Sequence, residues 1–100
     1  MMDLAAFKRS LKAGAPPDGM AVELRALWHA ANGGWDEAHR LIQNESSGDA
    51  AWVHAHLHRI EGDLNNAGYW YRRAGRPKSE QALPLEWDEI AGALLQGVRS

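Results

Sequence analysis

Residues 51–77 read AWVHAHLHRIEGDLNNAGYWYRRAGRP and predict two helices that reverse direction at a glycine. On the first helix, apolar residues recur at helical spacing: Val53, Leu57 and Ile60. Gly62 breaks this helix, and Asp63 is a good N-cap for a second helix that ends near residue 74. The stretch therefore predicts a helical hairpin, around which the rest of the chain is organised.

The composition is that of a single soluble domain. The chain has 100 residues, with 45% hydrophobic residues, 24% charged residues and a net charge of −2. The small net charge favours neither nucleic acid nor an anionic membrane as a partner. Cysteine is absent, which excludes disulfides, thiolate catalysis and cysteine-ligated zinc. Residues 1–14 lack the apolar region of a signal peptide, so we expect a cytoplasmic protein.

Apolar periodicity predicts helices throughout the chain. Glycine, proline and aspartate at the boundaries predict six helices, over about 3–13, 19–32, 35–44, 49–61, 64–74 and 84–98. No segment shows the sustained alternation of a strand, and the β-branched residues that favour strands are scarce. The sequence therefore predicts an all-α fold in one domain over residues 1–100.

An earlier part of the chain matches the 51–77 hairpin at an offset of 29 residues. The matched pairs are Ala26 with Ala55, His29 with His58, Gly33 with Gly62, Ala38 with Ala67, and Ile42 with Tyr71. In each copy the glycine reverses the chain, and the alanine of the second helix lets the helix axes approach closely. A large residue four positions later fills the groove on the same face.

This pattern resembles the tetratricopeptide repeat, which implies a right-handed array of antiparallel helical hairpins. The two copies span about 19–45 and 49–75. They depart from the family in having a period below its usual ~34 residues and a histidine in place of the aromatic residue of the first helix. Two copies alone bury little surface, so we expect helices 3–13 and 84–98 to cap the array, or the chain to form a homodimer.

A stripe on the fourth expected helix is the leading candidate for binding. In proteins with the repeat that this chain resembles, the equivalent stripe lines a concave ligand groove; here it consists of Trp52, His56 and Arg59, with Glu23 and Leu27 at the corresponding positions one copy earlier. An exposed Trp beside Arg is typical of peptide-binding surfaces. The leading hypothesis is therefore a non-catalytic module that binds a protein or peptide. In the alternative, Trp52 packs beneath the first or last helix.

Histidines on the same helix give a second hypothesis. His54 and His58 are four residues apart, share a helix face and can present two imidazoles to one metal ion. His29, the repeat equivalent of His58, would be the third ligand of a small-ligand or metal site. In the alternative, His29 and His58 are packing residues, each with a hydrogen-bonded ring nitrogen.

Other motifs in the sequence give weaker indications of function. Residues 69–78, YWYRRAGRPK, place cations beside aromatic rings, a combination found at nucleic-acid sites. Acidic residues follow and would neutralise this stretch, so nucleic-acid binding is not expected: they are Glu80, Glu86, Asp88 and Glu89. The sequence contains no nucleophile elbow and no phosphate-binding loop. No catalytic residue and no cofactor are predicted, and no membrane association is expected.

Overall fold

The computed structural model describes residues 2–96, and within that range it contains helices and no strand. The helices are α1 (Leu4–Ser10), α2 (Val22–Ala31), α3 (Trp35–Ile42), α4 (Gly48–Ile60), α5 (Leu64–Ala74) and α6 (Leu83–Gln96). The predicted all-α fold with six helices is confirmed. The expected end of the last helix, at residues 97 and 98, lies outside the described residues.

Capping side chains and a left-handed glycine set the boundaries of α4 and α5. Asp63 caps α5, as predicted, by accepting a hydrogen bond from the backbone N–H of Asn66. Ser47 caps α4 through the N–H of Ala50. Between the two helices Gly62 has a φ of +83°, which other residues adopt only at a cost. The turn at the centre of the 51–77 hairpin therefore forms for the reason that the sequence suggests.

The expected start of α2 is wrong by a few residues. Gly19 has a φ of +79°, so the chain is still turning at the position where the helix was expected to begin. Ala21 is the N-cap residue of α2, and it has no side chain that can accept a capping hydrogen bond. The chain therefore enters the helix only at Val22, because the glycine at residue 19 serves the preceding loop.

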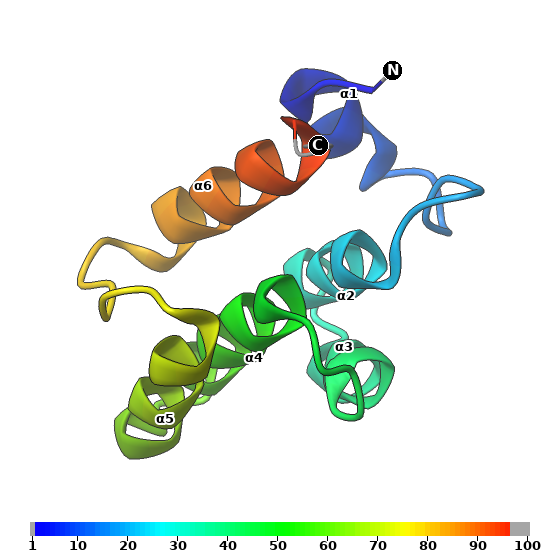
Figure 1. Ribbon diagram of the computed structural model, residues 1–100. Coiled ribbons are helices and arrows are strands. Elements are labelled where there is room, and N and C mark those ends of the chain that lie inside the picture. Colours follow the sequence, from blue (N-terminus) through cyan, green and yellow to red (C-terminus); the bar gives the residue numbers. More distant parts are fainter. Residues whose placement is uncertain (1, 97–100) are drawn as a thin grey trace.

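The helices form three layers, which Figure 1 shows in one view. α2 and α3 form one antiparallel hairpin, and α4 and α5 form the next. α2 and α4 make the middle layer, with α3 and α5 on one side and α1 and α6 on the other (Figure 1). α6 packs against both α2 and α4, and α1 packs against α6. The first and last helices thus cover the same face of the middle layer.

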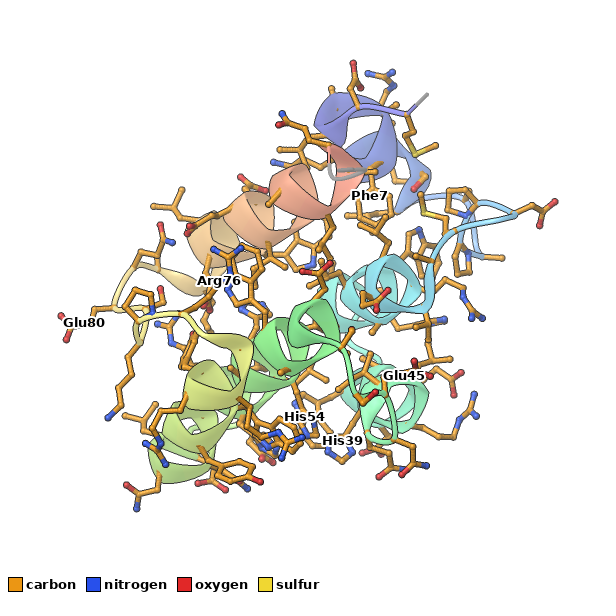
Figure 2. All side chains as sticks on the ribbon, viewed as in Figure 1. Phe7, His39, Glu45, His54, Arg76 and Glu80 are labelled. Atoms are coloured by element: carbon orange, nitrogen blue, oxygen red, sulfur yellow. The ribbon has the colours of Figure 1, made fainter. Side chains whose placement is uncertain are left out.

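Aromatic side chains hold the outer helices on this face. Phe7 of α1 is fully buried and stacks on Trp87 of α6, with ring centroids 5.6 Å apart. Figure 2 shows Phe7 pointing from α1 toward the interior. The indole N–H of Trp87 donates to the carbonyl of Leu27 at 2.8 Å. The indole N–H of Trp28 donates to the carbonyl of Ser10 at 3.3 Å. Burial and hydrogen bonding by the tryptophans therefore fix α1 and α6 against α2.

Candidate functional site

Helix α4 is the central element of the structure. Every residue from Ala50 to His58 is buried, because α2, α3, α5 and α6 all pack against this helix. Successive positions on a helix point in different directions, so its alternating histidines divide between two faces. His54 and His58 lie toward α3 and α5, whereas His56 lies toward α6.

On the first face, three imidazoles converge. His39 of α3 joins His54 and His58 of α4, and one ring nitrogen from each lies within 4.8 Å of the other two. The Nε2 atoms of His39 and His54 are 3.0 Å apart, a hydrogen-bond distance, and Figure 2 shows the two side chains close together between their helices. The rings of His54 and His58 stack with centroids 4.9 Å apart. We call these three residues the histidine cluster.

Tryptophans enclose the histidine cluster. The ring of Trp70 stacks on His54 with centroids 3.8 Å apart, and the ring of Trp35 stacks on His39 with centroids 4.9 Å apart. Trp35 is itself held in place, since its indole N–H donates to the carbonyl of Leu57 at 2.7 Å. The tryptophans therefore fix the orientation of two of the imidazoles and shield them from water.

The surroundings keep these imidazoles neutral. Burial, together with the neighbouring His39 and His58, lowers the pKa of His54 to about 4. Burial and the nearby His58 also lower the pKa of His39 below its usual value. Neutral imidazole is the form that coordinates metals, so near neutral pH these two side chains are already in the ligating state.

His58 has a carboxylate partner. Its Nδ1 lies 2.6 Å from Oε1 of Glu61, one turn further along the chain. A hydrogen bond from Nδ1–H to a carboxylate fixes the ring and leaves Nε2 as the free nitrogen. His58 and Glu61 also form a second group with Asp63, but both of these acidic residues are exposed.

The structure does not bring His29 into the histidine cluster. His29 lies at the end of α2, edge-on to Trp28 with centroids 5.1 Å apart, and it lines a surface depression together with Arg25. The expected set of His29, His54 and His58 is therefore corrected to His39, His54 and His58. The repeat alignment pairs equivalent positions, whereas the cluster forms between successive hairpins, where α3 packs against α4.

The second face of α4 holds the predicted binding stripe, and the expectation that this stripe is exposed is wrong. Trp52 is 4% exposed and His56 is 2% exposed. Arg59 is partly buried, with a side-chain exposure of 14%. The guanidinium of Arg76 lies 3.5 Å from the centroid of the Trp52 ring. The stripe is covered because α6 and the chain leading into it lie across α4, so a peptide could reach the stripe only if α6 moved.

A buried carboxylate occupies the middle of this face. Oε1 of Glu86, on α6, lies 2.7 Å from Nδ1 of His56 and accepts a hydrogen bond of 2.8 Å from the guanidinium of Arg59. The hydroxyl of Tyr71 donates to Oε2 of the same carboxylate. Arg59 also donates to the carbonyl of Gln81 at 2.8 Å. We call Glu86, His56, Arg59 and Tyr71 the Glu86 network.

The Glu86 network keeps its acid ionised. Burial opposes ionisation of Glu86, but the hydrogen bonds from His56, Tyr71 and Arg59 outweigh burial and hold its pKa below the usual value. Burial and the neighbouring carboxylate raise the pKa of Tyr71, so its hydroxyl stays protonated and donates. Glu86 is thus a structural anion, and the prediction that it neutralises a basic surface stretch is wrong.

The two remaining residues of the predicted site also belong to the fold. Leu27 of α2 is fully buried in the hydrophobic core of the protein. Glu23 is partly buried and accepts a hydrogen bond of 3.0 Å from the hydroxyl of Ser47. These two residues therefore contribute to packing and to the loop between hairpins, and they do not extend an open groove.

Comparison of the chain with protein-family models, curated proteins and solved structures found no match. The resemblance to the tetratricopeptide repeat thus stays a prediction from the matched residues. Within residues 2–96, no helix combines the length and the apolar character that crossing a membrane requires.

Proposed function

We propose that this protein binds a divalent transition-metal ion through His39, His54 and His58. The observation that carries the proposal is the convergence of one nitrogen from each imidazole within 4.8 Å of the others, on two helices whose packing fixes them. Three histidines form a complete protein ligand set for zinc in many sites, and imidazole also suits copper and nickel.

The spacing of the nitrogens supports this proposal. Zinc–nitrogen bonds of about 2.0–2.1 Å place neighbouring ligands of a tetrahedral ion roughly 3.3 Å apart. The Nε2 atoms of His39 and His54 are already 3.0 Å apart. An ion would take the place of the proton that these two nitrogens share. One ring nitrogen of His58 lies within 4.8 Å of a nitrogen of each of the other two rings, close enough to be the third ligand.

The second support is electrostatic. Three protonated imidazoles this close together would repel one another, and the lowered pKa values of His39 and His54 reflect that repulsion together with burial. A metal ion therefore competes with few protons near pH 7. The Glu61 carboxylate, 2.6 Å from Nδ1 of His58, holds the orientation of that ring, as carboxylates commonly do behind metal-bound histidines.

The test is a metal titration of untagged, chelator-treated protein. We expect about one equivalent of Zn²⁺ by calorimetry, and the visible absorption of a tetrahedral ion with Co²⁺. His39→Ala and His54→Ala should each weaken binding at least tenfold, on the order seen when metal-site residues are lost. His29→Ala is the matched control and should bind as the wild type does.

Two results would overturn the proposal. One is wild-type protein that takes up no stoichiometric Zn²⁺, Ni²⁺ or Co²⁺ at an ion concentration of about 100 μM, which corresponds to a binding free energy weaker than roughly −5.5 kcal/mol. The other is an equal loss of binding in His29→Ala and His54→Ala, which would place the ion away from the histidine cluster. Circular dichroism of each variant establishes that a loss of binding is not a loss of fold.

A further inference from the structure

A pocket opens on the other side of α4, where α1, α2, α4 and α6 meet. Its volume is about 390 Å³, and its walls are mainly apolar, with Leu11 from the residue that follows α1, Ile60 from α4 and Trp87 from α6. Lys8 and Asp88 line the pocket as an ion pair of 3.1 Å, so their charges cancel. A mainly apolar pocket of about 300–1,000 Å³ with few polar groups is the usual form of a small-molecule site.

Besides the Lys8–Asp88 pair, one more polar side chain forms part of the wall of this pocket. His56 lines it, although the residue is only 2% exposed. Nδ1 of His56 is held by Glu86, so Nε2 is the nitrogen left for the pocket. Nε2 of His56 has no hydrogen-bond partner among the described residues. It also keeps some contact with solvent, because within residues 2–96 the one fully buried side-chain polar atom without a partner is Nε of Arg25.

The Glu86 network decides what Nε2 can do. The carboxylate of Glu86 is already balanced by the guanidinium of Arg59, at 2.8 Å. Nδ1 of His56 lies 2.7 Å from Oε1 of Glu86, so the tautomer with its N–H at Nδ1 donates that N–H to the carboxylate. Nε2 then carries a lone pair and acts as a hydrogen-bond acceptor.

We propose that this pocket binds a small, uncharged aromatic alcohol of the phenol class, whose hydroxyl donates to Nε2 of His56. The apolar walls and the ring of Trp87 suit an aromatic body. The lone pair at Nε2 calls for a donor, and the internal Lys8–Asp88 pair offers no free charge to an ion. The site is independent of the histidine cluster, because His56 lies on the opposite face of α4 from His54 and His58.

The test compares two probes, 4-ethylphenol and its methyl ether 4-ethylanisole, which have the same ring and ethyl group but of which only the phenol can donate a hydrogen bond from its oxygen. Each is titrated into ¹⁵N-labelled protein, and the indole N–H of Trp87 and the ring nitrogens of His56 are followed by NMR. We expect both groups of signals to shift with 4-ethylphenol. The anisole should bind about tenfold more weakly, the effect of losing one hydrogen bond at the upper end of the usual range.

A filling substitution locates the site. Ala31 lines the pocket and is exposed, so Ala31→Phe should occupy the pocket without disturbing the core. We expect this variant to lose the shifts caused by 4-ethylphenol. Ala93→Phe is the matched control, because Ala93 is an exposed residue of α6 that does not line the pocket, and it should bind as the wild type does.

Three results would each overturn the inference. Equal binding of the two probes would show that Nε2 does not accept a hydrogen bond from the ligand. Unchanged binding by Ala31→Phe would place the probe elsewhere. The absence of any shift at Trp87 with millimolar 4-ethylphenol would show that the pocket does not admit this class of molecule. None of these results depends on whether the histidine cluster holds a metal.

Discussion

The two faces of α4 bury histidine in opposite ways. His54 and His58 meet another imidazole and two tryptophans, and the carboxylate that touches this face, Glu61, is exposed. His56 meets Glu86, which is the one buried acidic side chain among residues 2–96. Histidines that are two positions apart on one helix therefore differ in their surroundings. Those on the first face keep ring nitrogens with free lone pairs, whereas the one on the second face is bound to a buried anion.

This contrast shows that the neighbouring helices decide the chemistry of each histidine. On the face toward α3 a cation would gain ligands and displace shared protons. On the face toward α6 a cation would meet the guanidinium of Arg59, which already occupies the carboxylate. The first face thus leaves imidazole nitrogens available, as the proposed metal site requires, whereas on the second face the Glu86 network links α4 and α5 to α6 and holds that helix in place.

The largest expected effect comes from removing the anion of the second face. Glu86→Ala leaves the guanidinium of Arg59 without its buried partner, and such a loss typically costs about 3 to 5 kcal/mol. We expect a decrease of this size in the free energy of unfolding, measured by urea denaturation. The control is Glu80→Ala, at an exposed carboxylate that Figure 2 shows at the edge of the molecule. This substitution should change the free energy of unfolding by less than about 0.5 kcal/mol. A decrease below 1 kcal/mol for Glu86→Ala would mean that water reaches the network.

The next effect concerns pH and the first face. Burial and neighbouring imidazoles lower the pKa of His54 from 6.5 to about 4 in the folded protein, so the unfolded chain binds a proton there first as pH falls. This contribution to stability is fully present above pH 6.5 and is lost between pH 6.5 and pH 4. We expect His54→Gln to reduce the pH dependence of the unfolding free energy across that window by about 1 to 3 kcal/mol. Parallel profiles for the two proteins would show that His54 is not buried in its neutral form.

A smaller effect tests the carboxylate behind the histidine cluster. Glu61→Gln removes the charge that orients His58 while keeping a similar shape. Because Glu61 is exposed, we expect a loss of Zn²⁺ affinity of about tenfold, the lower end of the range for residues that support metal ligands. Calorimetric titration measures it, with Glu45→Gln in an exposed loop as the control. A complete loss of Zn²⁺ binding by Glu61→Gln would make Glu61 a ligand of the ion.

The smallest effect is expected at the surface. The Lys8–Asp88 pair joins α1 to α6, as the Glu86 network joins α4 to α6, but its side chains are 49% and 33% exposed. We expect Lys8→Ala to lower the free energy of unfolding by less than about 0.5 kcal/mol, and added salt to remove even that difference. A loss above 1 kcal/mol would show that α6 depends on its outer contacts as well as on the buried network.

Sequence reasoning predicted the features that local patterns control. Apolar periodicity gave the six helices, and Gly62 with Asp63 gave the central turn. Ala38 and Ala67 are both buried, as close approach of helices in each hairpin requires. These features depend on residues near one another in the chain, so helix geometry and capping are sufficient to derive them.

The site was predicted only in part, because periodicity shows which face of a helix is apolar and not which element covers it. Trp52, His56 and Arg59 form a stripe in the sequence, and the alternative in which Trp52 packs beneath the first or last helix agrees with its burial. The sequence pattern alone could not decide between that alternative and an exposed stripe. Glu86 belongs to an acidic stretch and has no feature that marks it as buried. His39 could have been found by considering that the second helix of one hairpin packs against the first helix of the next, as α3 packs against α4.

The position of α6 also has a consequence for the order of folding. The α2–α3 and α4–α5 hairpins join neighbours in the chain, whereas Trp87 bonds to Leu27 across a separation of 60 residues. Local contacts form sooner than distant ones, because closing a long loop costs more entropy. We therefore expect α6 to dock last, with the dehydration of Glu86 as a late step. The carboxylate of Glu86 would then lose its water only after His56, Arg59 and Tyr71 are in place to form hydrogen bonds with it.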